Sequence, residues 1–396
     1  MNRYGYEPER YESERYELKR CESERYETER NGPVPRLHSP ADSKKDYANV
    51  LPGRIIEQHR EQYTVVTEFG ELTAVLKGSF FHETDSQTDY PCVGDFVEIR
   101  RNDSGISWIV ELLPRKSKFS RADFSGHAAG YVKTIREQVV AANFDYVFLL
   151  TSLNQDFNVK RILRYLTQTR QSGSMPVVLL TKADLIGKTT NGAQVGYQLY
   201  EAIESIRNGA PDVPVHAISS QTGFGMDALD AYLLPGKTVV FLGMSGVGKS
   251  SLLNALMESK VMQVKAIRDD DSRGRHTTTH RQLFLLPSGA MVIDTPGMRE
   301  LGLFDAGDGI HASFSDVEAL FGACRFRDCR HVSEPGCAIL AALREGSLPQ
   351  LRWDQYRAQI GENRFVGDRN GALRDKRVFQ KSIALQSRKS KNHTDH

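Results

Sequence analysis

Three short segments that carry the residues of a nucleotide site occur along this chain in an order that restricts its fold. The tetrapeptide TKAD comes first, at residues 181–184, GMSGVGKS follows at residues 243–250, and DTPG comes last, at residues 294–297. In ordinary GTPases the TKAD-type loop comes after the phosphate loop. Because nucleotide loops lie at the carboxyl ends of parallel strands, a chain can be cut and rejoined elsewhere and still form the same pocket. The order therefore predicts a circularly permuted nucleotide-binding domain.

The GMSGVGKS segment has the surroundings that a phosphate loop requires. Residues 238–242 predict a strand that runs into the loop, and residues 251–256 open a helix. Its glycines allow backbone N–H groups to face phosphates at the helix N-terminus. We expect Lys249 to reach the β- and γ-phosphates and to act in catalysis, and Ser250 to bind Mg²⁺. The other nucleotide contacts expected here are Gly243, Ser245, Gly246, Val247, Gly248 and Ser251.

The DTPG segment ends a second predicted strand, at residues 291–294. Asp294 is placed to reach Mg²⁺ through water, and the backbone N–H of Gly297 can donate to the γ-phosphate. Alone, a DxxG pattern is a weak signal. Downstream of a phosphate loop it becomes a strong one.

A polar, glycine-containing segment at residues 269–280 precedes that strand. It predicts a mobile switch in which a threonine closes on Mg²⁺ and the γ-phosphate. Thr278 and Thr279 are favoured over Thr277 for this role.

The residue that orients the attacking water differs from that of Ras-type enzymes. Met298 stands where those enzymes place a glutamine, and a thioether cannot orient water. We expect His276 to position the water or accept its proton. The alternative is that His276 is an exposed loop histidine without a role.

The TKAD segment indicates a guanine site. A carboxylate accepts both the N1–H and the N2–H₂ of guanine, and adenine offers neither donor in this arrangement, so Asp184 selects GTP. The stem of Lys182 can cover the ring, and the hydroxyl of Thr181 can supply part of the hydrogen bonding of the usual asparagine. The alternative is that Asp184 only caps a helix. Ser219 and Ser220 fit the second base-contact loop.

A cluster of metal-binding residue types occurs near the C-terminus, in the pattern C-x4-C-x-H-x5-C. Three thiolates and one imidazole are the donor set of a closed, structural Zn²⁺ site. Unligated buried thiols are the alternative. Predicted helices flank the cluster at 315–322 and 337–346, so we expect a small helical domain that depends on the metal. The four residues are Cys324, Cys329, His331 and Cys337.

Strand and helix patterns predict a multidomain protein. Short β-like segments over 46–121 suit a five-stranded barrel, for which an OB-fold is the natural candidate. Apolar strands alternate with amphipathic helices over 122–305, which predicts a doubly wound α/β domain around a mainly parallel sheet. The zinc-binding helical domain is expected over 306–365, with a basic tail at 366–396.

The first 30 residues consist largely of pentads such as YEPER, YESER and YETER, with few aliphatic side chains. Five residues advance a helix by about 500°, so the tyrosines never form one apolar stripe. We therefore expect residues 1–45 to be a disordered or loosely helical leader that buries no core. Contact of its Tyr/Arg alternation with RNA is the alternative.

Charge and hydropathy bear on partners and location. The net charge of +2 is uninformative, but basic residues cluster at 374–391 and at Arg115, Lys116, Lys118 and Arg121. These clusters suit a phosphate backbone, and a solvated charged loop is the alternative for the second. The sequence contains no run of about 18 apolar residues and no signal-peptide core. A cytoplasmic protein without membrane contact is expected.

Together these segments resemble the RsgA (YjeQ/YloQ) family of small ribosomal subunit biogenesis GTPases. The match covers residues 48 to about 365 and includes VGD and LPRK in the barrel, TKAD, GMSGVGKSSLLN, GRHTTTH, DTPG and the cysteine cluster. The resemblance implies slow GTP hydrolysis, stimulated by the small subunit, and a catalytic role for His276 in place of the missing glutamine. Thr181 and the pentads depart from the family pattern.

The motifs and the resemblance lead to one expected function and two alternatives. We expect a monomeric enzyme that hydrolyses GTP to GDP and phosphate, binds the immature small ribosomal subunit and its rRNA, and uses hydrolysis to time its release. The first alternative is an rRNA-binding assembly chaperone in which GTP is a conformational switch and turnover is incidental. The second, an extracytoplasmic or metabolic P-loop ATPase, is disfavoured by Asp184.

Overall fold

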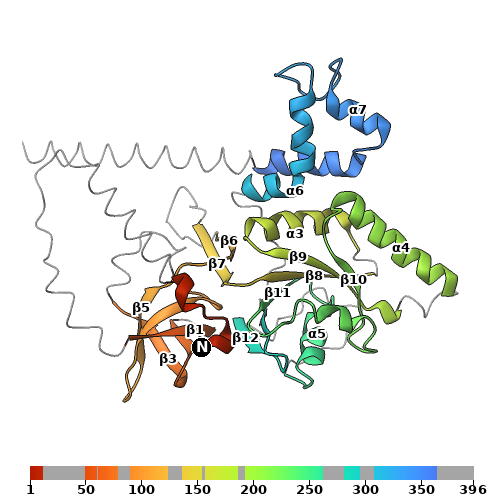
Figure 1. Ribbon diagram of the computed structural model, residues 1–396. Coiled ribbons are helices and arrows are strands. Elements are labelled where there is room, and N and C mark those ends of the chain that lie inside the picture. Colours follow the sequence, from red (N-terminus) through yellow and green to blue (C-terminus); the bar gives the residue numbers. More distant parts are fainter. Residues whose placement is uncertain are drawn as a thin grey trace, which may run out of the picture.

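A barrel, a central sheet with helices on both faces and a small helical domain follow one another in the computed structural model (Figure 1). The structure describes residues 1–11, 50–59, 61–78, 90–123, 136–153, 157–185, 192–261, 281–294 and 307–363. No helix in these ranges is both long and apolar enough to cross a membrane.

The predicted five-stranded barrel is confirmed. Its strands pair in the order β1-β2-β3-β5-β4 and close through a β1–β4 ladder. Strand β3 runs parallel to β5, and the other pairs are antiparallel. This is the closed Greek-key arrangement of an OB-fold. The strands are β1 (Val50–His59), β2 (Gln62–Thr67), β3 (Gly70–Leu76), β4 (Phe96–Arg100) and β5 (Ser107–Leu112).

The predicted doubly wound α/β sheet is also confirmed. Its strands lie in the order β10-β9-β8-β11-β13-β12, and all are parallel except β12. The chain runs outward from β8 to β10 and then returns to place β11 on the other side of β8, so the strand order reverses between β8 and β11. Ligands of open α/β sheets bind at such a reversal. The strands are β8 (Tyr146–Ser152), β9 (Met175–Thr181), β10 (Val215–Ala217), β11 (Thr238–Leu242), β12 (Arg281–Leu285) and β13 (Met291–Asp294).

Alternate residues of these strands face two separate cores. Val178, Leu180 and Val240 pack with the face that α3 (Val159–Gln171) and α4 (Gly192–Gly209) cover. Val177 and Val239 pack with the opposite face, against α5 (Lys249–Leu256). The period-two pattern of a strand accounts for this division, and both faces are apolar because both are covered.

Two local features differ from the expected pattern. An amphipathic segment at 226–234 predicts a helix, but only a 3-10 turn, Met226–Leu229, forms there. Pro235 disfavours helical conformation only at Leu234, the last residue of that segment. An antiparallel hairpin of β6 (Lys118–Asp123) and β7 (Arg136–Ala142) connects barrel and sheet and was not anticipated.

Strand β1 joins the barrel to the central sheet. Its first half pairs with β4, whereas Glu57 and Gln58 pair with Gln282 and Arg281 of β12. The barrel and the α/β sheet therefore share one continuous hydrogen-bonded sheet of eleven strands.

A buried arginine satisfies backbone carbonyls at this junction. Arg54 is 1% exposed and donates to the carbonyl oxygens of Gly94 (3.2 Å), Asn143 (2.8 Å) and Tyr4 (2.6 Å). Its guanidinium lies 4.8 Å from the ring centroid of Phe96. Burial lowers the pKa of Arg54 to about 10, because the charged form loses its hydration. One side chain thus links barrel, sheet and N-terminus.

The expectation that residues 1–45 bury no core is wrong for residues 1–11. Tyr4 and Tyr11 are 8% and 4% exposed, and Tyr11 packs with Phe96 and Leu113 of the barrel. Tyrosines at a five-residue spacing cannot form a stripe, but a pair of them can fill a local groove. The rest of the predicted leader, residues 12–45, lies outside the described residues.

The C-terminal domain has its own core and docks on the α/β domain. It contains α6 (Gly307–Ala319), the 3-10 turn Leu320–Ala323, α7 (Ala338–Glu345) and a helical stretch at 350–363. Helix α6 lies across α3 (Figure 1). Arg352, 5% exposed, pairs with Asp316 (Nε to Oδ2, 2.7 Å) and donates to the carbonyl of Gly209 at the end of α4.

Candidate nucleotide site and metal cluster

Glycines set the shape of the phosphate loop between β11 and α5. Gly246 and Gly248 adopt φ of +79° and +106°, a region that strains residues with a Cβ. A Cβ on Gly243 would lie 2.4 Å from the carbonyl oxygen of Leu150. Gly248 is also the N-cap of α5, so the loop delivers its N–H groups to the start of that helix. Such a helix N-terminus attracts anions.

The side chains of the phosphate loop differ in their exposure to solvent. Lys249 Nζ donates to the carbonyls of Gly243 (2.6 Å) and Met244 (2.9 Å), so its ammonium lies across the loop. Val247 is buried and anchors the loop in the core beneath it, whereas Ser245 is exposed. The two serines expected to contact phosphate and Mg²⁺ are half-buried in the first turn of α5. They are Ser250 and Ser251.

A buried hydrogen bond connects the TKAD loop to the phosphate loop. Thr181, at the end of β9, donates from Oγ1 to the carbonyl of Val247 at 2.6 Å, with a longer contact of 3.3 Å to Thr151 O. Strands β9 and β11 flank β8, so their carboxyl ends lie two strand spacings apart, about 10 Å. Segments 66 residues apart in sequence therefore meet at one edge of the sheet.

The carboxylate expected to read the base is held by the second predicted base loop. Ser219 Oγ donates to Asp184 Oδ1 at 2.6 Å and accepts from the N–H groups of Gln221 and Thr222, both at 3.3 Å. Ser219 is buried and the neighbouring Ser220 is half-buried.

The backbone of the TKAD loop also turns sharply. Lys182 has φ of +59°, a left-handed conformation uncommon for residues other than glycine. Such strain tends to occur at functional sites. Asp184 itself is half-buried, two residues beyond the end of β9 in this turn.

Asp294 ends β13, next to the phosphate-loop strand. Asp294 pairs with Phe241 in the ladder between β13 and β11, and it is 9% exposed. Burial raises the pKa of Asp294, and the nearby charge of Lys249 partly opposes this effect. A buried carboxylate beside a phosphate loop is a group that a bound cation would stabilise, so its position fits a Mg²⁺ site.

Five residues of the predicted site, four in the switch and one in the DTPG segment, lie outside the described residues. They are His276, Thr277, Thr278, Thr279 and Gly297. Their roles stay predictions.

Thr181 offers a direct test of the joined loops. Replacing Thr181 with valine keeps the shape but leaves the buried Val247 carbonyl without its donor. We expect GTP affinity to fall by about 5- to 10-fold, or about 1 kcal/mol, and Thr181→Asn to recover most of it. Equilibrium binding of a fluorescent GTP analogue measures both. Unchanged affinity in the valine variant would contradict a role for this bond.

The Cys/His cluster has the geometry of a metal site. The four ligand atoms lie within 4.8 Å of one another. His331 Nδ1 is 3.6 Å from Cys324 Sγ and 3.4 Å from Cys337 Sγ. A tetrahedral Zn²⁺ with ordinary bond lengths requires sulfur–nitrogen separations of about 3.5 Å. Three thiolates and one imidazole in this arrangement fit Zn²⁺.

Aromatic packing fixes the histidine ligand of the cluster. The ring of Phe321 stacks on His331 at 4.7 Å, and Trp353 contacts it edge-on at 5.7 Å. His331 has φ of +59°, a left-handed conformation that is uncommon for residues other than glycine. The metal cluster and the domain core are therefore one packed unit, which also contains Cys337.

The basic strip expected to contact RNA is largely engaged within the protein. Arg115 pairs with the fully buried Asp95 (Nη2 to Oδ2, 2.6 Å), and Lys116 pairs with Asp145 at 2.9 Å. Asp145 lies where the barrel meets the sheet, and the charge of Lys116 helps to hold its pKa below its usual value despite partial burial. Ion pairs at the domain junction therefore hold both residues, and their contact with RNA stays a prediction.

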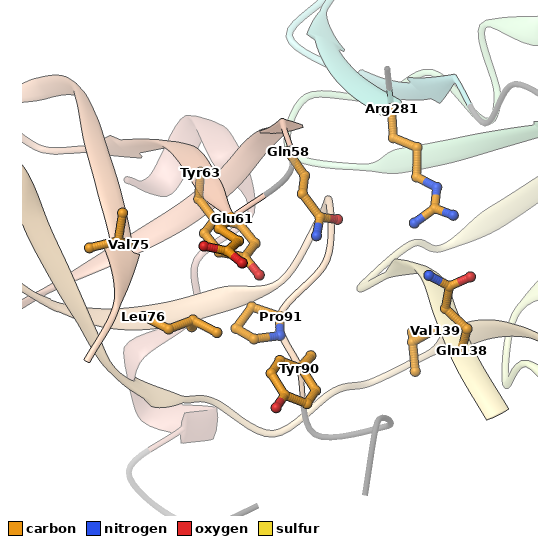
Figure 2. A pocket seen from close by; sticks show the side chains of 10 residues that line it. All are labelled: Gln58, Glu61, Tyr63, Val75, Leu76, Tyr90, Pro91, Gln138, Val139 and Arg281. Atoms are coloured by element: carbon orange, nitrogen blue, oxygen red, sulfur yellow. The ribbon is translucent and has the colours of Figure 1, made fainter. Parts of the chain in front are cut away.

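A cavity of about 370 Å³ lies away from the nucleotide loops, between the barrel, the β6–β7 hairpin and β12. Figure 2 shows its lining, with Arg281 and Gln138 on one side and Tyr63 and Glu61 on the other. None of its lining residues belongs to the phosphate or TKAD loop. The chemistry therefore places the candidate site at the sheet edge, and not in this cavity.

Sequence reasoning missed the residues that hold the domains together. Arg54, Asn143 and Arg352 are polar residues in unremarkable sequence surroundings, and their partners come from distant segments. Only Asn143 carries a local peculiarity, φ of +55°, which asparagine tolerates better than most residues.

The fold and these loops define a class of protein, the circularly permuted GTPases. A family model described as "RsgA GTPase" matches residues 112–304. A relative named "Small ribosomal subunit biogenesis GTPase RsgA 2" from Listeria monocytogenes is 42% identical over 337 residues, 84% of this chain and 90% of the relative. One from Streptomyces avermitilis, named RsgA, is 42% identical over 330 residues, 83% and 84% of the two chains.

Solved structures agree with this class. YjeQ from Thermotoga maritima gives a TM-score of 0.58 at 27% identity, covering 79% of this chain and 98% of that one. YloQ, titled a circularly permuted GTPase, gives 0.55 at 23% identity, covering 85% and 99%, and supports the fold alone. The chain belongs to the RsgA GTPase family, and it is a GTPase.

Proposed function

We propose that this chain binds GTP with Mg²⁺ at the carboxyl edge of β9, β11 and β13. It hydrolyses GTP to GDP and phosphate, and hydrolysis times its release from the immature small ribosomal subunit late in assembly. The observation that carries the proposal is the 2.6 Å hydrogen bond from Thr181 to Val247, which joins the base-reading and phosphate loops. The names of the relatives supply the ribosomal part.

Each loop has a separate task in this proposal. The N–H groups of the loop at 243–250 bind the phosphates, and the Lys249 ammonium exchanges its carbonyl partners for phosphate oxygens. Ser250 and Asp294 would hold Mg²⁺, which neutralises phosphate charge when bound. Gly297 would donate its N–H to the γ-phosphate, and Thr278 or Thr279 would close on it.

Asp184 selects the base, and neighbouring residues hold its carboxylate in position. The Ser219 bond orients one carboxylate oxygen, which leaves the carboxylate plane available to the N1–H and N2–H₂ of guanine. Lys182 covers the ring, and Ser220 contributes to the second base loop. The hydrogen bond of Thr181 takes the structural place of the usual asparagine.

Asp184→Asn should reverse base preference. The amide cannot accept two hydrogen bonds from guanine, but it can accept from N1–H and donate to the C2 carbonyl of xanthine. We expect GTP affinity to fall by about tenfold or more and xanthosine triphosphate to bind better than GTP. Competition binding with both nucleotides measures this, with the exposed Asp230→Asn as matched control. A variant that still prefers GTP would contradict the assignment.

GTP turnover with and without purified small ribosomal subunits tests the ribosomal role. We expect stimulation of about tenfold or more, since completion of a switch around GTP can raise turnover by orders of magnitude. We assign the positioning of water to His276, so His276→Ala should bind GTP, lose stimulated turnover and remain on the subunit. Normal dissociation of that variant would favour an assembly chaperone with incidental turnover.

The remaining assignments follow the same proposal. The Cys/His cluster holds one structural Zn²⁺, and the protein works as a cytoplasmic monomer. The working boundaries are 46–121 for the barrel, 122–305 for the GTPase domain and 306–365 for the zinc domain. The basic segment at 374–391, outside the described residues, supplies affinity for rRNA phosphates.

A further inference from the structure

The first eleven residues pack on a surface where the barrel meets the central sheet (Figure 1, red). We call this surface the junction groove, and it is formed by Arg54, Phe96 and Leu113 of the barrel and Gly236 of the loop before β11. It lies apart from the GTP loops and from the metal cluster. The sequence motif that fills it is part of the pentad repeat, which the GTPase function does not use.

Two tyrosines of the segment fill the apolar part of the groove. Tyr6 and Tyr11 stack with ring centroids 5.4 Å apart and an interplanar angle of 8°. Both rings contact Phe96, at 5.7 and 5.3 Å. Leu113 and Met1 complete the cluster, and Tyr11 is 4% exposed. The five-residue spacing of the pentad thus produces a stacked pair that suits one phenylalanine.

The backbone of the segment makes the polar contacts. The Tyr4 carbonyl accepts the 2.6 Å hydrogen bond from Arg54 Nη1, and this guanidinium also donates to carbonyls of the barrel and of the sheet. Gly5 has φ of +74°, and a Cβ there would lie 2.7 Å from the carbonyl oxygen of Gly236. Gly236 stands two residues before β11, the strand that leads into the phosphate loop.

We propose that the junction groove is a docking site for an aromatic peptide and that residues 1–11 occupy it within the same chain. The bound peptide fixes the barrel against the sheet, because it completes the partners of Arg54 on one side and packs on Gly236 on the other. When the peptide leaves, Arg54 loses one acceptor and Phe96 loses both tyrosine rings. A peptide that binds here needs three features. They are two tyrosines that stack on Phe96, a glycine where the backbone approaches Gly236, and a backbone carbonyl that accepts from Arg54.

A peptide-binding experiment on the full-length chain tests this site. The variant Tyr6→Ala/Tyr11→Ala releases the segment, and a fluorescent synthetic peptide of residues 1–11 is titrated against it by anisotropy. We expect saturable binding at least about tenfold tighter than to the wild type, whose groove is already filled. A peptide with alanine at both tyrosines should bind at least about tenfold more weakly.

Hydrogen exchange gives a second readout in the same chains. Amides at 94–97 and 236–239 should exchange faster in the double variant and return towards wild-type rates when the peptide is added. The matched control is Tyr197→Ala/Tyr200→Ala on α4, where both tyrosines are 61% exposed, and it should leave these amides unchanged.

Folding of the variants is checked by circular dichroism and by a cooperative thermal unfolding transition. If the double variant does not fold, Gly5→Ala takes its place in both measurements, because its Cβ clashes with Gly236 while every tyrosine is kept. Equal peptide binding to wild type and variant, or unchanged exchange at 94–97 and 236–239, overturns the proposal. Neither result bears on GTP hydrolysis, so this inference stands or falls independently of the proposed function.

Discussion

Lys249→Ala is expected to lower kcat/KM for GTP hydrolysis by roughly 10²–10³-fold, the usual cost of removing a charge-stabilising donor from an active site. The ammonium lies across the phosphate loop on the carbonyls of Gly243 and Met244, so it needs only a small movement to meet phosphate oxygens. Charge develops on those oxygens as phosphate is transferred. Steady-state phosphate release measures the effect.

The control for this variant is the exposed Lys260→Ala, which removes the same charge a few residues beyond α5. It should keep wild-type turnover. Near-normal hydrolysis in Lys249→Ala would contradict the assignment of the loop at 243–250. A loss equal in both variants would mean that general charge, and not position, matters.

Removal of the metal is expected to unfold the C-terminal domain while the GTPase domain stays folded. Binding of a structural Zn²⁺ contributes on the order of 10 kcal/mol in small zinc domains, and the core around Phe314 and Trp353 is too small to replace it. The two tryptophans of the chain make this visible. Trp353 is 6% exposed and lies against His331, whereas Trp108 is 40% exposed on the barrel.

The measurement uses Trp108→Phe, so that emission reports Trp353 alone. Chelation, or Cys337→Ser, should shift the fluorescence emission of Trp353 to the red. The measured zinc content should fall below one Zn²⁺ per chain. Cys92→Ser, outside the cluster, should keep both the metal and the spectrum. If Trp353 stays buried after the metal is gone, the domain does not depend on the ion for its fold.

The loops of the candidate nucleotide site were predictable because their signals are local. The glycines at 246 and 248 are required by backbone angles, and the strand before them and the helix after them are visible in the sequence. The permuted order implied that the TKAD and phosphate loops meet, and the Thr181–Val247 hydrogen bond confirms that they are neighbours. The alternation of apolar strands with amphipathic helices along the chain predicted the doubly wound sheet for the same reason.

Partners of single polar residues were not predictable. Arg115 and Lys116 look like a nucleic-acid strip in the sequence, yet they pair with Asp95 and Asp145. The sequence does not show which carboxylate a basic residue will pair with, because an arginine pairs with whichever carboxylate the fold brings to it. Ion pairs of this kind need coordinates.

Local sequence signals account for the barrel strands, the α/β alternation, the phosphate loop and the Cys/His cluster, because each depends on neighbours within a few residues. The way in which these parts are joined emerges only in the folded chain. There β1 pairs with β12, Arg54 lies inside the junction, and residues 1–11 pack beside Phe96. Backbone geometry and period follow from adjacent residues, whereas a docking contact depends on two surfaces that exist only after each has folded.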